Sequence, residues 1–127
     1  MLDTNILFSS ILYRNEQIDR LFLILDNCQI VLSDKIVDEI YDVVERKRSD
    51  KIKDIKMFLN AMNYTLVKTP KDLSNTPYIR DEKDKPILAA AVSNDIDYFI
   101  TGDKDFLTLE VKKPKIMSMQ EFIKEFS

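Results

Sequence analysis

Residues 85–103 read KPILAAAVSNDIDYFITGD, a predicted helix followed by a predicted strand. Pro86 lies just inside the start of the helix at 85–93, where the missing N–H of proline costs nothing. Residues 98–101 (YFIT) are rich in the aromatic and β-branched residues of strands, and Gly102 ends the strand. A helix that leads into such a strand is typical of a parallel sheet covered by helices on both faces.

The rest of the chain continues this alternation. Further strands are predicted at residues 1–3, 29–32, 64–67 and 115–117. Further helices are predicted at residues 5–13, 16–26, 34–48, 51–62 and, after a capping box at 118–121, near the end of the chain. Residues 68–80 contain two prolines and are predicted to form a loop. The pattern predicts an α/β fold with a mostly parallel sheet.

The composition is that of a globular protein. The 127 residues are 45% hydrophobic and 32% charged, which predicts a single domain over residues 1–127. No apolar run is long enough to cross a membrane, and no basic-then-apolar export leader is recognisable. Cys28 is the only cysteine, so no internal disulfide can form. We therefore expect a cytoplasmic protein without a membrane segment.

Two absences restrict the chemistry. The chain has no histidine and one cysteine, which excludes serine–histidine and cysteine–histidine catalysis and the usual Cys/His zinc sites. It has one glycine, Gly102, which excludes a P-loop and a GxGxxG dinucleotide motif. An enzyme of this composition must use carboxylates, either as an acid/base pair or as ligands of a hard cation. With a net charge of −3, a nucleic acid would have to bind at a local basic patch.

Two acids directly follow predicted strands. Asp3 follows Met1-Leu2, and Asp103 follows the strand at 98–101. Ligands of open α/β sheets bind at the carboxyl ends of strands. Each acid also has a plainer interpretation: Asp3 can be the N-cap of the next helix, and Gly102-Asp103 can be a sharp turn. Asn5 can cap the same helix or orient Asp3.

Two other acids lie on helix faces that the pattern predicts to be buried. Glu39 lies on the apolar stripe of Ile36, Ile40 and Val43, where a carboxylate without a partner is costly. Asp84 begins an i, i+3, i+4, i+7 apolar face. The plainer interpretations are a Glu39 that reaches solvent from the edge of the stripe and an Asp84 that acts as an N-cap.

These acids would converge if the fold is as predicted. Four carboxylates cannot share one pocket as bare anions, because like charges raise one another's pKa values. A divalent cation resolves the conflict, and an all-oxygen site suits Mg²⁺ or Mn²⁺. Such sites typically act on phosphates, so the residues predict metal-assisted phosphodiester hydrolysis.

The chain resembles PIN-domain ribonucleases in three segments: Asp3-Thr4-Asn5, residues 80–91 (RDEKDKPILAAA) and residues 101–107 (TGDKDFL), with Glu39 in the helix after VLS. It is most similar to the toxin components of bacterial and archaeal toxin–antitoxin modules of the VapC type. The resemblance implies a three-layer α/β/α sandwich and a Mg²⁺- or Mn²⁺-dependent endoribonuclease. One departure is that only Met1-Leu2 precede the first acid, where the family usually has a strand of several residues.

The resemblance also implies roles for single residues and partners. The catalytic and metal-binding acids would be Asp3, Glu39, Asp84 and Asp103. Asn5, Asp81 and Asp105 would support them. RNA is the implied substrate, a homodimer the implied assembly, and a small antitoxin protein the implied inhibitor. Arg14 and Lys104 are placed to contact RNA phosphates.

Other functions remain as alternatives. A response-regulator receiver would not need Glu39 on a helix stripe, and a haloacid-type phosphatase needs an acid where Asn5 stands. A PIN-like module that binds RNA or protein without cleavage is a further alternative, although all four acids are present. Carboxylate–metal chemistry does not distinguish RNA from DNA, so a metal-dependent DNA nuclease also stays open.

Overall fold

The computed structural model describes all residues from 1 to 127, and 56% of them are helical. Its α-helices are α1 (Thr4–Leu12), α2 (Glu16–Leu25), α3 (Asp34–Lys47), α4 (Ile52–Met62), α5 (Lys85–Ser93), α6 (Lys104–Leu107) and α7 (Met119–Phe126). Its strands are β1 (Val31–Ser33), β2 (Thr65–Val67), β3 (Tyr98–Ile100) and β4 (Lys115–Met117), and two short 3-10 helices are η1 (Ser49–Lys51) and η2 (Glu82–Asp84). The predicted order of helices and strands is confirmed after the first three residues, with α6, η1 and η2 as additions. The strand predicted at residues 1–3 is reduced to a single bridge at Leu2.

All strand pairings are parallel, as predicted. Strand β1 pairs with β2, and β3 pairs with β4. The short segment Met1-Leu2 runs alongside β3, where Leu2 bridges Ile100 and the Asp3 N–H donates to the Ile100 carbonyl at 3.0 Å. The strands thus form two separate parallel pairs, the second extended by Met1-Leu2. The α/β class is confirmed, while a sandwich around one continuous central sheet stays a prediction.

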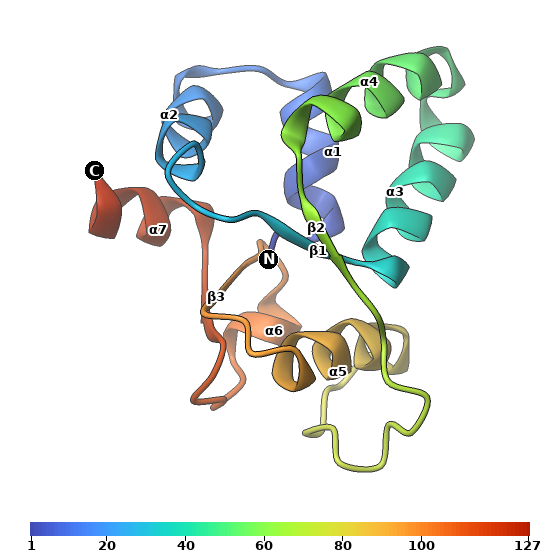
Figure 1. The fold of residues 1–127 in the computed structure, drawn as a ribbon, viewed down its shortest axis with the longest axis vertical. Coiled ribbons are helices and arrows are strands. Elements are labelled where there is room, and N and C mark those ends of the chain that lie inside the picture. The colour runs from blue at the N-terminus through green and yellow to red at the C-terminus, as the bar shows by residue number, and fades with distance from the viewer.

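The helices begin and end where local sequence signals predict. Ser33 and Asn15 accept hydrogen bonds at the N-termini of α3 and α2, and Ser118 with Glu121 forms the predicted capping box of α7. In the view of Figure 1, α1, α3 and α4 lie above β1 and β2, while α5 and α6 lie below them. Helix α7 packs against α2. The apolar faces of these elements enclose one core of 23 buried residues.

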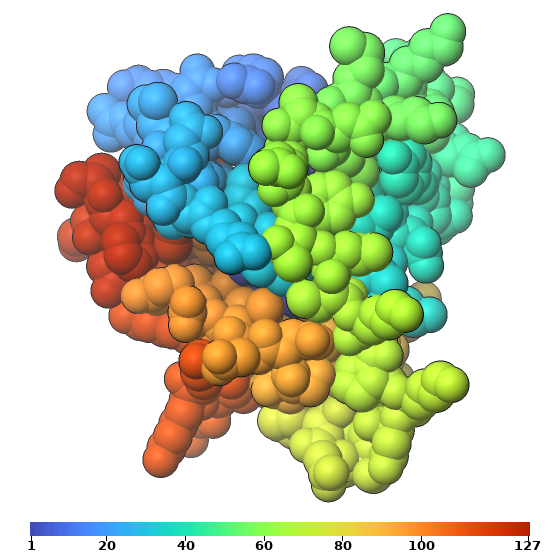
Figure 2. Space-filling view, viewed as in Figure 1, coloured from blue at the N-terminus to red at the C-terminus, as the bar shows by residue number.

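The N-terminus lies in the middle of the fold rather than at its surface (Figure 1). The Met1 ammonium donates a hydrogen bond to the Tyr98 carbonyl at 2.6 Å. Burial lowers the pKa of this amino group to about 5, against the opposing effect of the Asp97 carboxylate. A predominantly apolar cavity of about 450 Å³ adjoins Met1, between Ile30 and Val31 on one side and Tyr98 on the other. Figure 2 shows the cyan and orange segments that border it.

No helix in the structure combines the length and apolar character needed to span a membrane.

Candidate metal centre

A buried threonine at the end of β3 forms hydrogen bonds with two acids, Asp3 and Asp103. Thr101 follows the strand and is fully buried. Its hydroxyl donates to Asp3 Oδ2 at 2.7 Å and accepts a hydrogen bond from the Asp103 N–H at 3.0 Å. Because Met1-Leu2 runs parallel to β3, both strands present an acid at the same edge, as predicted. Thr101 joins these two acids through its side chain.

Gly102 does not play the role predicted for it. Its φ does not lie in the left-handed region, and a Cβ placed on it would meet no atom within 4 Å. The backbone at residue 102 therefore accepts a Cβ without a clash, and the turn does not depend on the conformational freedom of glycine. The carboxylate of Asp103 accepts the Asp105 N–H at 2.9 Å and so caps the start of α6.

Asp3 is the most deeply buried acid of the site, with 5% of its surface exposed. It is the N-cap of α1, since its Oδ1 accepts the Thr4 N–H at 2.8 Å. Burial raises its pKa, and the charges of Glu39 and Asp103 raise it further. The hydrogen bonds from Thr101 and Thr4 oppose the rise. Asp3 thus acts as an N-cap through Oδ1, as the plainer interpretation predicted, while Oδ2 accepts the hydrogen bond from Thr101.

Asp84 stands at the N-cap position of α5, yet its side chain caps nothing. Burial is the main cause that raises its pKa to about 7, followed by the negative charges of Asp103 and Asp81. The charge of Asp3 contributes in the same direction. The negative charge of the Asp84 carboxylate is therefore not balanced by a cap hydrogen bond or by a cation of the protein.

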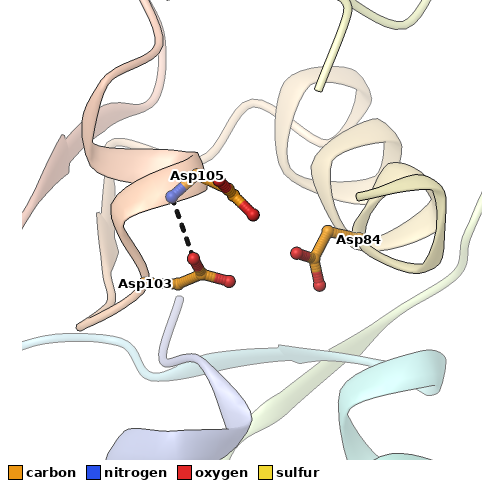
Figure 3. Close-up of side chains that lie close together, drawn as sticks. All are labelled: Asp84, Asp103 and Asp105. Carbon is orange, nitrogen blue, oxygen red and sulfur yellow. Dashed lines mark hydrogen bonds between the residues drawn. The ribbon is translucent and has the colours of Figure 1, made fainter. Parts of the chain in front are cut away.

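Three carboxylates converge at this point. Asp84, Asp103 and Asp105 each offer an oxygen, and these oxygens lie within 4.8 Å of one another. Figure 3 shows Asp84 reaching toward Asp103 and Asp105 from the start of α5, and the two other acids at the start of α6. All three are half-buried. The set of hard oxygen donors fits a divalent cation such as Mg²⁺ or Mn²⁺.

A family model described as "PIN domain" matches residues 1–105. The chain belongs to the PIN-domain family. No curated protein matches it. PIN domains are generally nucleases and typically bind divalent metals, which agrees with the acidic group at the ends of the strands.

Two of the four predicted acids of this PIN domain, Asp84 and Asp103, belong to the converging group. Asp3 and Glu39 lie outside the 4.8 Å group, although both act electrostatically on the site. Glu39 is half-buried and has no cationic partner. The buried row of α3 is Ile36, Ile40 and Val44, with i, i+4 spacing, so the stripe predicted through Val43 is rotated and Glu39 stands at its edge.

The three residues predicted to support the acids of this PIN domain differ in what their side chains contact. Asn5 is exposed and makes no hydrogen bond to Asp3, so Thr101 and the Thr4 N–H hold that acid instead. Asp81 caps η2 through the Lys83 N–H. Asp105 belongs to the converging group itself. Thr101 was missed by sequence reasoning, and its one signal was a hydroxyl residue between a strand and an acid.

The cations near the site are few. Arg80 holds the Asp105 carboxylate with two hydrogen bonds of 2.9 and 3.0 Å, and this pairing lowers the pKa of Asp105. Lys104 is exposed and forms no ion pair. Arg14, the other predicted RNA contact, pairs with Asp19 at 2.7 Å. Arg80 is thus the cation that directly contacts the acidic group.

Proposed function

We propose that this PIN domain is a metal-dependent endoribonuclease and the toxin of a toxin–antitoxin pair. The observation that carries the proposal is the convergence of Asp84 and Asp103, beside the buried Asp3, at the carboxyl ends of parallel strands. The absence of histidine leaves carboxylates and water to perform the chemistry. Membership of the PIN family supports nuclease activity, and the sequence resemblance supports RNA as the substrate.

The side chains would divide the work of metal binding. Asp84 and Asp103 are the proposed direct ligands, because neither carboxylate is neutralised by a cation of the protein. Asp3 adds negative charge next to Asp84 and is held in place by Thr101. Glu39 would join directly or through water. A Mg²⁺ or Mn²⁺ ion bound there supplies Lewis-acid stabilisation of phosphate charge and lowers the pKa of water.

The reaction that these residues support is hydrolysis of a phosphodiester. The oxygen of water bonds to phosphorus, the P–O3′ bond breaks, and a proton of the water ends on the O3′ oxygen. The products would carry 5′-phosphate and 3′-hydroxyl ends, as the PIN resemblance implies. The three acids are half-buried, so solvent reaches their carboxylates.

The decisive experiment compares acid-to-amide variants on a short RNA. Asp84→Asn and Asp103→Asn should each lower the cleavage rate about a hundredfold or more, because they remove charge that the cation needs. Asp42→Asn is the matched control, since Asp42 is an exposed acid paired with Arg46 on α3. Cleavage should stop in EDTA and return with Mn²⁺. Equal activity of all variants, or cleavage that survives EDTA, would refute the proposal.

Two further comparisons separate the alternatives. A DNA strand of the same sequence tests whether the nuclease acts on RNA or DNA. RNA that binds in Mn²⁺ and stays intact would indicate a binding module without catalysis.

The toxin role adds partners to the proposal. It requires cytoplasmic RNA as the target, a small antitoxin protein and, by the family resemblance, a homodimer. Light scattering of the purified protein measures the assembly. Co-expression with the protein encoded by the neighbouring reading frame should relieve growth arrest, and growth that is unaffected by the PIN domain alone would argue against a toxin.

A further inference from the structure

Arg80 is joined to the acidic group by a contact between distant parts of the chain. Its Nε and Nη2 donate to the two oxygens of Asp105, 25 residues later, at 2.9 and 3.0 Å. The preceding residue, Ile79, is buried in the core and anchors the loop. The Arg80 side chain itself is 79% exposed, whereas that of Asp105 is 18% exposed. Within this ion pair, the Asp105 carboxylate is largely buried, and the Arg80 side chain is exposed to solvent.

Asp105 is already satisfied without a metal ion. Both of its carboxylate oxygens accept hydrogen bonds from Arg80, and its N–H donates to Asp103 Oδ1 at 2.9 Å. A cation at Asp84 and Asp103 could use only the remaining lone pairs of Asp105, because the guanidinium already occupies one on each oxygen. The geometry thus separates Asp105 from the two acids whose charge has no counter-ion.

Arginine has five N–H donors, and the pair with Asp105 uses two of them. The remaining donors have no hydrogen-bond partner in the protein, and the side chain as a whole is 79% exposed. A guanidinium fixed in this way presents a planar fork that matches phosphate oxygens, at the border of a group that otherwise repels anions.

We propose that Arg80 binds a phosphate oxygen of the RNA beside the cleaved bond, and that Asp105 is the positioning residue that holds Arg80 there. This inference rests on the proposed function, and it assigns to Asp105 a role other than metal ligand. A bidentate pair of this kind can also stabilise the fold, so the test below measures RNA and Mn²⁺ affinity rather than stability.

The test compares Arg80→Gln, Arg80→Lys and Asp105→Asn with Arg46→Gln, a matched control. Arg46 is also exposed and paired with an acid, Asp42, at 3.2 Å, but on α3. We expect Arg80→Gln to raise KM for RNA about tenfold to a hundredfold, the worth of a charged hydrogen bond to phosphate. Arg80→Lys should restore part of this loss, and Arg46→Gln should change KM little. The slope of log affinity against log salt should fall by about 0.7 in Arg80→Gln.

Asp105→Asn decides between positioning and metal ligation. We expect it to raise KM as Arg80→Gln does, while calorimetric titration with Mn²⁺ alone shows unchanged affinity. A loss of Mn²⁺ affinity in Asp105→Asn, together with unchanged KM in Arg80→Gln, would overturn the inference.

The inference can fail separately from the proposed function. If the wild-type protein cleaves RNA and Arg80→Gln cleaves it with the same KM, only the role of Arg80 is refuted. If the wild-type protein does not cleave, RNA affinity in Mn²⁺ replaces KM as the measurement. Equal RNA affinity of wild type and Arg80→Gln would then refute the phosphate contact.

Discussion

Replacing Thr101 by valine removes one hydroxyl from the centre of the site and keeps the shape of the side chain. That hydroxyl donates to Asp3 Oδ2 at 2.7 Å and accepts the Asp103 N–H at 3.0 Å. Valine would leave a carboxylate that is 5% exposed and a half-buried N–H without these partners. Each buried polar group left unpaired costs about 1–3 kcal/mol, so we expect unfolding free energy to fall by about 2–4 kcal/mol at pH 8.

Urea unfolding followed by circular dichroism measures this loss. Thr101→Ser is the matched control, because it keeps the hydroxyl and removes one buried methyl group, at about 1 kcal/mol. The difference in unfolding free energy between the two variants should narrow as the pH is lowered, since burial raises the pKa of Asp3 and protonation removes the charge that is costly to bury. Thr101→Val should also cleave RNA more slowly than Thr101→Ser. If both variants are equally stable and active, the hydroxyl does not hold the two acids and our reasoning about Asp3 is wrong.

Three further predictions address neighbouring features. In the metal-free protein, the Asp84 carboxyl has a folded pKa of about 7 and an ordinary unfolded value of 3.8, so its stabilising contribution is present below about pH 4 and is lost as the pH rises to about 7. The Tm of the wild type minus that of Asp84→Asn should therefore fall over this range. Taking this difference cancels the opposite pH dependence of stability that the buried Met1 amino group causes in both proteins. A Tm difference that does not change with pH would contradict the raised pKa of Asp84. Gly102→Ala should leave Tm unchanged or raise stability by about 0.4–1 kcal/mol, and a marked loss would show that the turn needs glycine. Adding Val-Ile-Val ahead of Met1 should raise the unfolding free energy by about 1–2 kcal/mol for each side chain that enters the adjoining cavity. Adding Gly-Ser-Gly should not raise it. Equal Tm values of the two extended proteins would show that the cavity does not accept an extended strand.

Local signals in the sequence identified most helices and the acids at their starts. A residue such as Ser118 caps a helix through neighbours three positions away, so the information lies within one short segment. The signals that mark the ends of strands also lie within short segments, and they identified Asp3 and Asp103 as acids at strand ends. The same rule is insufficient by itself, because Asp34 also follows a strand, and its carboxylate is used by the N–H and hydroxyl of Thr69.

The features that sequence reasoning missed depend on contacts between distant segments. Thr101 and Asp3 are 98 residues apart, and Arg80 and Asp105 are 25 apart. No periodicity connects such pairs, since each depends on how a loop or strand packs. Asn5 illustrates the converse, because the motif Asp-Thr-Asn suggested a partner for Asp3, whereas the start of α1 leaves the amide exposed.

A helix cap and a metal ligand are compatible roles for a carboxylate, because a cap uses only one of its two oxygens. Asp3 and Asp103 each accept a backbone N–H at the start of a helix, with one oxygen, and this bond fixes the orientation of the carboxylate. Asp84 occupies the same position on α5 without making such a bond, and burial together with the charges of Asp103 and Asp81 raises its pKa. The two capped acids are oriented by the protein, while the third has the charge that the protein leaves uncompensated. A divalent cation would therefore stabilise Asp84 most, so Asp84→Asn should reduce Mn²⁺ affinity more than Asp3→Asn does, and calorimetric titration showing the reverse order would contradict this argument.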